Sequence, residues 1–270
     1  MSNYIYSGQA LGAAAHFHRL DDVENLNHLI PTLGASVLAP TGGASESHIK
    51  DYAYKVDHPR HRTLVSIRKI DTAVTGKETE AGFETDVNAD VIDIDVLEKL
   101  HIDSVRLHFF ASRPVEPDDA VPTVTTKGSH VAGIRMGAVT ATVTLDEEPL
   151  THCGTAQQLG DFYRAQSEEY KKEHGWRYHL DVHGSADPHP HHHRFTLVKG
   201  IQLSGPETEL QSISLERTNV IRWKGFGRIF LGEVEVKGNE RRVTLVRLAM
   251  GSDGGGSGTA GSGSSNGQTG

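Results

Sequence analysis

Strict alternation of apolar and hydroxyl-bearing residues is the feature that most constrains the fold of this chain. In the run AVTATVTL, Val139, Ala141, Val143 and Leu145 alternate with threonines. Successive side chains of a β-strand point to opposite faces of the sheet. The run therefore predicts a strand with one buried face and one solvent-exposed face.

Further β-rich runs occur along the chain. The run GRIFLGEVEVKGNERRVTLVRLAM has two β-rich halves around a turn-type cluster, Lys237 to Glu240, and predicts a hairpin near the C-terminus. Shorter runs are TLVSIRKI, DVIDIDVL, SVRLHFF and RFTLVKGIQL. Their spacing predicts a mainly β fold, either sandwich-like or an extended curved antiparallel sheet.

Two segments have helical character. Residues 155–174 place apolar side chains on one stripe, with Thr155 and Gln158 able to form a capping box and Gly175 as a stop, so they predict one long helix. The segment DDVENLNHLIP predicts a short helix over about residues 21–30, which Pro31 ends. Helices are thus expected to be a minority beside the sheet.

The domain organisation follows from composition. Residues 1–250 are expected to form a single β-rich domain, with a subdomain break possible near residues 113–122, where the loop is acidic and rich in proline. Residues 251–270 are a tail rich in glycine and serine with no apolar side chain larger than alanine. Such a tail is expected not to fold by burying itself, although a neighbouring subunit could hold it still.

Charge and cysteine content exclude several classes of protein. A formal net charge of −8 argues against general nucleic-acid binding, which needs clustered lysine and arginine. A single cysteine, Cys153, excludes intrachain disulfides and cysteine-based zinc clusters. No secretory signal is expected, because Gln9, His16 and His18 interrupt the N-terminal run, and no membrane-spanning segment is expected, because no apolar stretch is long enough. The expected location is the cytoplasm, with export by a non-classical route as the alternative.

A histidine-rich segment, HLDVHGSADPHPHHHRF, spans residues 179–195. On a strand, His179, Asp181 and His183 would project from one face, a ligand set that zinc, nickel or iron can use. A solvent-exposed loop that binds metal adventitiously is the favoured interpretation, and pH sensing by clustered imidazoles is a third. No cofactor is therefore expected, and a divalent metal at these three residues is the alternative.

Two other groups of residues are candidate sites. Asp86, Asn88 and Asp90 match the start of a calcium-binding loop, but the match then fails, and a solvated strand edge is favoured. In RWKGFGR, Trp223 and Phe226 could stack on a ligand ring, although a packing corner between two strands is favoured. No catalytic residues are assigned.

The stretch GSHVAGIRMGAVTATV, the opening YIYSGQALGAAA, the run GRIFLGEVEV and the close RLAMGSDGGG through SSNG carry a resemblance. Together they resemble an uncharacterised family of bacterial proteins. The resemblance covers nearly the whole chain and implies that the tail is native. It implies no catalytic residue.

The expected function is non-enzymatic. Abundant β-structure and the lack of a catalytic constellation favour a structural or binding protein that assembles into a homo-oligomer or polymer, with its tail docking on a neighbouring subunit. One alternative is a metal-binding protein or metalloenzyme centred on residues 179–193. The other is a carbohydrate or small-ligand binding module at Trp223 and Phe226.

Overall fold

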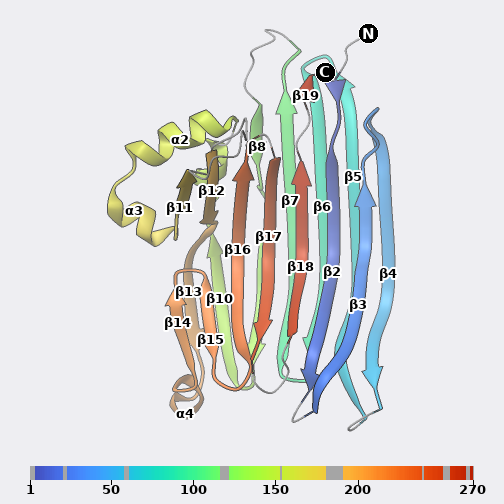
Figure 1. Cartoon of the computed structure of the whole chain (residues 1–270), viewed down its shortest axis with the longest axis vertical. Coiled ribbons are helices and arrows are strands. Elements are labelled where there is room, and N and C mark those ends of the chain that lie inside the picture. Colours follow the sequence, from blue (N-terminus) through green and yellow to red (C-terminus); the bar gives the residue numbers. More distant parts are fainter. Residues whose placement is uncertain are drawn as a thin grey trace.

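Two antiparallel β-sheets lie face to face in the computed structural model of the chain (Figure 1). The structure describes residues 4–20, 23–57, 61–115, 122–152, 154–180, 191–238, 240–251, 256–265 and 268–269. The expected fold class, mainly β with a sandwich-like antiparallel arrangement, is confirmed.

One sheet has eight strands within the described residues. Their spatial order is β13 (Val198–Ser204), β10 (Val139–Leu145), β9 (His130–Met136), β7 (Leu100–Arg113), β6 (Gly82–Val96), β5 (Arg62–Thr79) and β4 (Gly43–Val56), with β8 (Thr123–Thr125) paired to β7. The strand predicted from AVTATVTL is β10, where Val139 and Ala141 are buried and Thr140 and Thr142 are exposed, as the alternation requires.

The second sheet has nine strands in the same described ranges. Their order is β11 (Arg177–Leu180), β12 (His191–Thr196), β16 (Gly227–Lys237), β17 (Glu240–Met250), β18 (Gly256–Ser265), β2 (Gly8–Leu20) and β3 (Val23–Val37), with β14 (Ile213–Arg217) and β15 (Val220–Trp223) branching beside β16. The predicted C-terminal hairpin is β16 and β17, in which Lys237 pairs with Glu240. The short strands β1 (Tyr4–Ile5) and β19 (Gln268–Thr269) pair with each other near the two termini.

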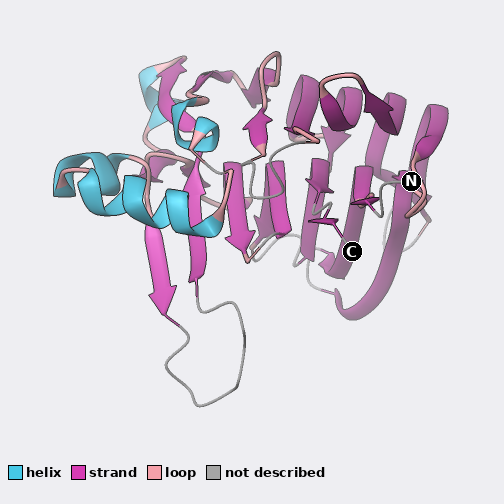
Figure 2. Ribbon diagram, turned by 90° about the horizontal axis from the view of Figure 1, so that it is seen from above, coloured by secondary structure: helices cyan, strands magenta, loops and turns pink. Residues whose placement is uncertain are grey.

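The helices gather at one side of the sandwich (Figure 2). They are α1 (Glu148–Thr151), α2 (Ala156–Ala165) and α3 (Glu168–Glu173), while α4 (Glu207–Leu210) precedes β14. Trp176, just after α3, stacks on Phe195 of β12 at 4.4 Å between ring centroids. In the described ranges, no helix is long and apolar enough to cross a membrane.

The single long helix predicted over residues 155–174 is wrong in its length. Thr155 does cap α2 by accepting a hydrogen bond from the Gln158 N–H at 3.1 Å. The helix then stops at Ala165, because Gln166 is extended and the Ser167 hydroxyl accepts from the Tyr170 N–H and starts α3. A serine hydroxyl that can cap a new helix competes with continuation of the old one.

The short helix predicted over residues 21–30 is wrong. Asp21 lies outside the described residues, and Val23 onwards forms β3, which pairs with β2. Pro31 is tolerated because β3 is an edge strand and the β2–β3 register shifts opposite Ala14, where the missing N–H is not needed. Ile30 and Leu33 face the core.

The glycine- and serine-rich segment does fold, contrary to the expectation for an isolated tail. Residues 256–265 form β18, an inner strand of the chain's own sheet between β17 and β2. Backbone hydrogen bonds on both edges hold this strand without large apolar side chains. Its glycines let the other sheet come close, since a Cβ on Gly263 would lie 2.8 Å from Val87 Cγ1. The subdomain break near residues 113–122 stays a prediction, because residues 116–121 lie outside the described part.

A row of residues interrupts the strand alternation across the eight-stranded sheet. At this row the regular pairing skips one residue per strand, and inward-facing residues are three positions apart, as in Ile67 and Ile70 on β5. The backbone is left-handed in alternate strands of the row, with φ of 50° at Asp51, 52° at Asp93 and 67° at Gly133. We call it the charged row; it consists of Asp51, Arg68, Asp93, Asp103 and Gly133.

A matching row crosses the nine-stranded sheet. We call it the glycine row; it consists of Gly34, Gly12, Gly261, Leu245 and Gly232. Here the residue that the pairing skips in each strand faces the opposite sheet, and a Cβ on Gly12 would lie 2.2 Å from Cγ2 of Ile70. In the charged row the skipped residue of each strand faces outwards, away from the nine-stranded sheet. In the glycine row the skipped residue faces towards the eight-stranded sheet. The skipped residues of both sheets therefore point in the same direction, which lets the two sheets bend together and stay in contact.

Candidate functional site

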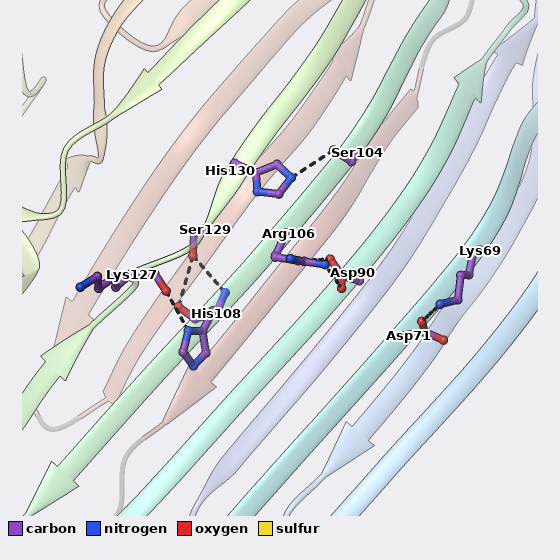
Figure 3. Close-up of polar contacts among 9 residues, drawn as sticks. All are labelled: Lys69, Asp71, Asp90, Ser104, Arg106, His108, Lys127, Ser129 and His130. Atoms are coloured by element: carbon purple, nitrogen blue, oxygen red, sulfur yellow. Dashed lines mark hydrogen bonds and ion pairs between the residues drawn. The ribbon is translucent and has the colours of Figure 1, made fainter.

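Charged and polar side chains cover the outer face of the eight-stranded sheet (Figure 3). Asp86, Asn88 and Asp90 point outwards from β6 because the residues between them are buried. Arg106 of β7 lies opposite Asp90 and binds it with two hydrogen bonds of 2.7 and 2.9 Å, which raises the pKa of Arg106. The prediction that this acidic stretch is a strand edge is wrong, since β6 lies between β5 and β7.

A second ionic group lies on β4 and β5. Asp71 forms an ion pair with Lys69 and a 2.9 Å hydrogen bond with Nδ1 of His48. Partial burial acts to raise the pKa of Asp71, but the hydrogen bonds from Lys69 and His48 outweigh it, so the net pKa is lowered from 3.8. Asp71 therefore stays ionised to lower pH than a free aspartate.

Two more histidines lie on this face (Figure 3). His108 Nδ1 lies 2.8 Å from the carbonyl oxygen of Lys127, and the backbone N–H of His108 donates to Ser129 Oγ at 2.9 Å. His130 Nε2 lies 3.1 Å from Ser104 Oγ. These contacts tie β9 and the turn before it to β7.

Two aspartates of the charged row and the neighbouring His101 form a cluster of metal-ligand type. Asp93, His101 and Asp103 place one ligand atom each within 4.8 Å of one another. Arg68 pairs with Asp93, and Arg135 Nη2 lies 2.8 Å from Asp103 Oδ1. Both carboxylates are thus already engaged by arginines, and the side chains are partly exposed, so the cluster is a surface ion-pair network whose contribution to stability is small.

The predicted metal ligands fall largely outside the described part of the chain. Asp181 and His183 lie outside the described residues, and His179 is on β11, where its backbone pairs with His192. Metal binding at His179, Asp181 and His183 stays a prediction.

The described end of the histidine-rich segment is part of a sheet. His192 Nε2 lies 2.8 Å from Glu235 Oε1, and Arg194 Nη2 donates to the same oxygen at 2.7 Å. Partial burial opposes ionisation of Glu235, but these two hydrogen bonds dominate, and the pKa of Glu235 is lowered from 4.5. His193 lies on the opposite face of β12 from His192 and is fully buried. For His192 and His193, the favoured solvent-loop interpretation is wrong, because β12 pairs with both β11 and β16.

The rings of Trp223 and Phe226 stack with centroids 5.0 Å apart. Phe226 is only 3% exposed, and its N–H donates to the Trp223 carbonyl, so the pair closes the turn between β15 and β16. This is the arrangement of a packing corner. Ligand stacking at these two residues stays a prediction.

An apolar surface lies at the free edge of the nine-stranded sheet. Leu29 and Val37 of β3 are 63% and 62% exposed, the highest values among the large hydrophobic side chains of the described residues. Both face outwards, as does Ala35 between them. We call these three residues the β3 patch.

The sequence contained a signal for this patch that the helical interpretation obscured. On a helix, Leu29 falls beside the inward stripe, but on a strand Ile30 points inwards and Leu29 must point outwards. The residues from His28 to Val37 include no Asp, Glu, Lys or Arg. A proline within a β-rich segment is typical of an edge strand, and the lack of charged residues leaves this edge without that protection against pairing.

The comparisons with known proteins agree with the resemblance noted from the sequence. No curated protein and no solved structure matches the chain. A match to a family described as Domain of unknown function (DUF8256) covers residues 4–237, so strands β17 and β18 lie beyond it. The resemblance to an uncharacterised family is confirmed: the chain belongs to the family described as Domain of unknown function (DUF8256).

Proposed function

We propose that this chain is a non-enzymatic structural or binding protein that self-assembles through the edge formed by β3. The observation that carries the proposal is the β3 patch, whose two large side chains are more than 60% exposed on an edge strand. Exposed apolar surface on an edge strand favours addition of another strand. The partner is a second copy of the chain, joined across a two-fold axis.

The two edge strands on this side of the sandwich differ in how they resist pairing. β4 carries Glu46, Lys50, Asp51 and Lys55, and such charges oppose strand addition. The described side chains of β3, from His28 to Val37, include none of these residue types. Pro31 protects only its own position and the Val37 N–H already donates to Ser45 Oγ of β4 at 3.2 Å, so the segment from Leu33 to Ser36 is the part of β3 best suited to pairing.

The glycine- and serine-rich segment supports assembly from within the subunit. β18 joins the β2–β3 hairpin to the rest of the nine-stranded sheet. A chain that ends at Gly251 should therefore assemble less well, since the β2–β3 hairpin loses its strand pairing to the rest of the sheet. The single cysteine fits a reducing compartment, and we place the assembly in the cytoplasm.

Size-exclusion chromatography with light scattering on the untagged full chain tests the proposal. The unchanged chain should elute as a dimer, and the double variant Leu29→Lys/Val37→Lys should elute as a monomer with an unchanged circular dichroism spectrum. Leu215→Lys is the matched control, because Leu215 is 45% exposed on β14, away from β3. An unchanged chain that is monomeric, or a double variant that assembles as before, would overturn the proposal.

A further inference from the structure

A trough crosses the outer face of the nine-stranded sheet, away from the β3 patch. It has a volume of about 620 Å³, which lies in the range of small-ligand sites. Its floor is β18, where Ser262 and Ser264 face outwards yet are only 9% and 7% exposed. The small side chains of β18 lie below the longer ones of β17 and β2 on either side, and this difference in height makes the trough.

The lining of the trough carries more cations than anions. Four arginines and two glutamates line the trough, a local excess of positive charge in a chain whose formal net charge is −8. The arginines are Arg194, Arg217, Arg242 and Arg247.

Two of these arginines are already held by the glutamates. Arg247 binds Glu233 through two hydrogen bonds of 2.6 and 2.7 Å, and Arg194 binds Glu235 at 2.7 Å. Arg242 makes only a loose contact with Glu240 at 3.7 Å, beyond hydrogen-bond distance, and its side chain is 51% exposed. Arg242 is therefore well placed to bind an anionic group of a ligand.

Hydroxyl and amide groups surround Arg242. In the sheet register Arg242 lies beside Ser264, which lies beside Gln9. Gln9 Nε2 donates to Ser264 Oγ at 2.9 Å, and Thr244 Oγ1 lies 3.2 Å from Ser262 Oγ. Each hydroxyl retains a further donor or acceptor position for a ligand hydroxyl.

Among the described residues that line the trough, none offers an open aromatic face to a nucleobase, and His174 is only 2% exposed. The guanidinium carbon of Arg247 lies 3.7 Å from the ring centroid of Phe230 and covers it, and Phe195 is 4% exposed. A ligand must instead satisfy Arg242, with Arg217 also in the lining, and a set of hydroxyl and amide groups. We propose that the trough binds an acidic saccharide, with its carboxylate on Arg242 and its hydroxyl groups on Ser262, Ser264 and Gln9.

Titration calorimetry of the full chain with a disaccharide of uronic acids tests this proposal. Saturable binding is expected, and the matching neutral hexose disaccharide should bind about tenfold or more weakly, because it lacks the charge that Arg242 recognises. Equal binding of the two sugars, or no saturable binding of the acidic one, would overturn the proposal. Displacement of the sugar by an acidic peptide or a nucleoside diphosphate at lower concentration would also overturn it, by assigning the trough to that other class.

Variants locate the site. Arg242→Gln should weaken binding about tenfold or more, and Ser264→Leu should abolish it by filling the trough. Arg228→Gln is the control, because Arg228 lies on the same sheet and pairs with Glu216 outside the trough lining. Equal weakening by Arg242→Gln and Arg228→Gln would mean nonspecific charge attraction and would overturn the site. The assembly variant Leu29→Lys/Val37→Lys should keep full binding, so this proposal and the proposed self-assembly fail independently.

Discussion

The charged row and the glycine row are the same kind of interruption in strand pairing, but they are built from different side chains. Each interrupts the pairing of five strands at one residue per strand, and each has left-handed backbone in every second strand. In the charged row, two of the three left-handed positions are aspartates, Asp51 and Asp93. In the glycine row, all three are glycines.

The direction of the skipped residue explains why one row has aspartates and the other has glycines at the left-handed positions. At the charged row the skipped residue points to solvent, where an aspartate has room and tolerates the left-handed region better than most residues. At the glycine row it points at the opposite sheet, and a Cβ on Gly261 would lie 2.6 Å from Val105 Cγ1. One row therefore retains side chains that form ion pairs, whereas the other makes close contact between the sheets possible.

The largest effect is expected from filling the glycine row. Gly261→Val places a branched side chain against Val105 at a φ of +61°. Crowding of the core costs roughly 1–3 kcal/mol and the left-handed backbone roughly 1–2 kcal/mol. The free energy of unfolding should fall by about 2–5 kcal/mol in urea denaturation.

Gly200→Val is the matched control for this change. Gly200 lies on β13, its φ is not left-handed, and an added Cβ meets nothing within 4 Å. Its substitution should leave the free energy of unfolding nearly unchanged. Similar losses for both variants would mean that glycine content, and not the row, determines stability.

The strands could be predicted from the sequence, but the rows could not. Alternation in residues 139–145 identified β10, because its pattern is uninterrupted. In β3 the alternation breaks at Pro31 and at Gly34, and the remaining spacing imitates a helix. β18 has no apolar pattern at all, because its position depends on backbone hydrogen bonds to β17 and β2.

The trough was missed for a related reason. Gln9, Arg242 and Ser264 are far apart in sequence and become neighbours only through the pairing of β2, β18 and β17. Prediction from the sequence instead favoured local density, such as the histidines of residues 179–193. A signal did exist in β17, where Arg242 and Thr244 alternate with the buried Val243, but it identified only one wall.

A smaller effect is expected at the charged row. Asp93→Val should lower the free energy of unfolding by about 1–2 kcal/mol, because a branched residue must adopt a φ near +52°. Asp93→Asn loses the charge but keeps the tolerance for this backbone, so it should lose less than about 1 kcal/mol, the scale of an exposed ion pair. Chemical denaturation of both variants measures the difference. Equal losses would assign the effect to the ion pair with Arg68 and not to the backbone.

The smallest effect is expected from acid. The pKa values of Asp71 and Glu235 are lowered from 3.8 and 4.5, so the unfolded chain binds protons at these groups more readily than the folded chain. Their contribution to stability is present at neutral pH and should be lost as the pH falls below about 4.5. Asp71→Asn and Glu235→Gln should each cost less than about 1 kcal/mol at neutral pH, and each should reduce the loss of stability between about pH 7 and about pH 3. Gly261→Val adds no ionisable group and should lower stability equally at every pH. If the carboxylate variants keep the full pH dependence of the unchanged chain, the outer ion pairs do not control its acid stability.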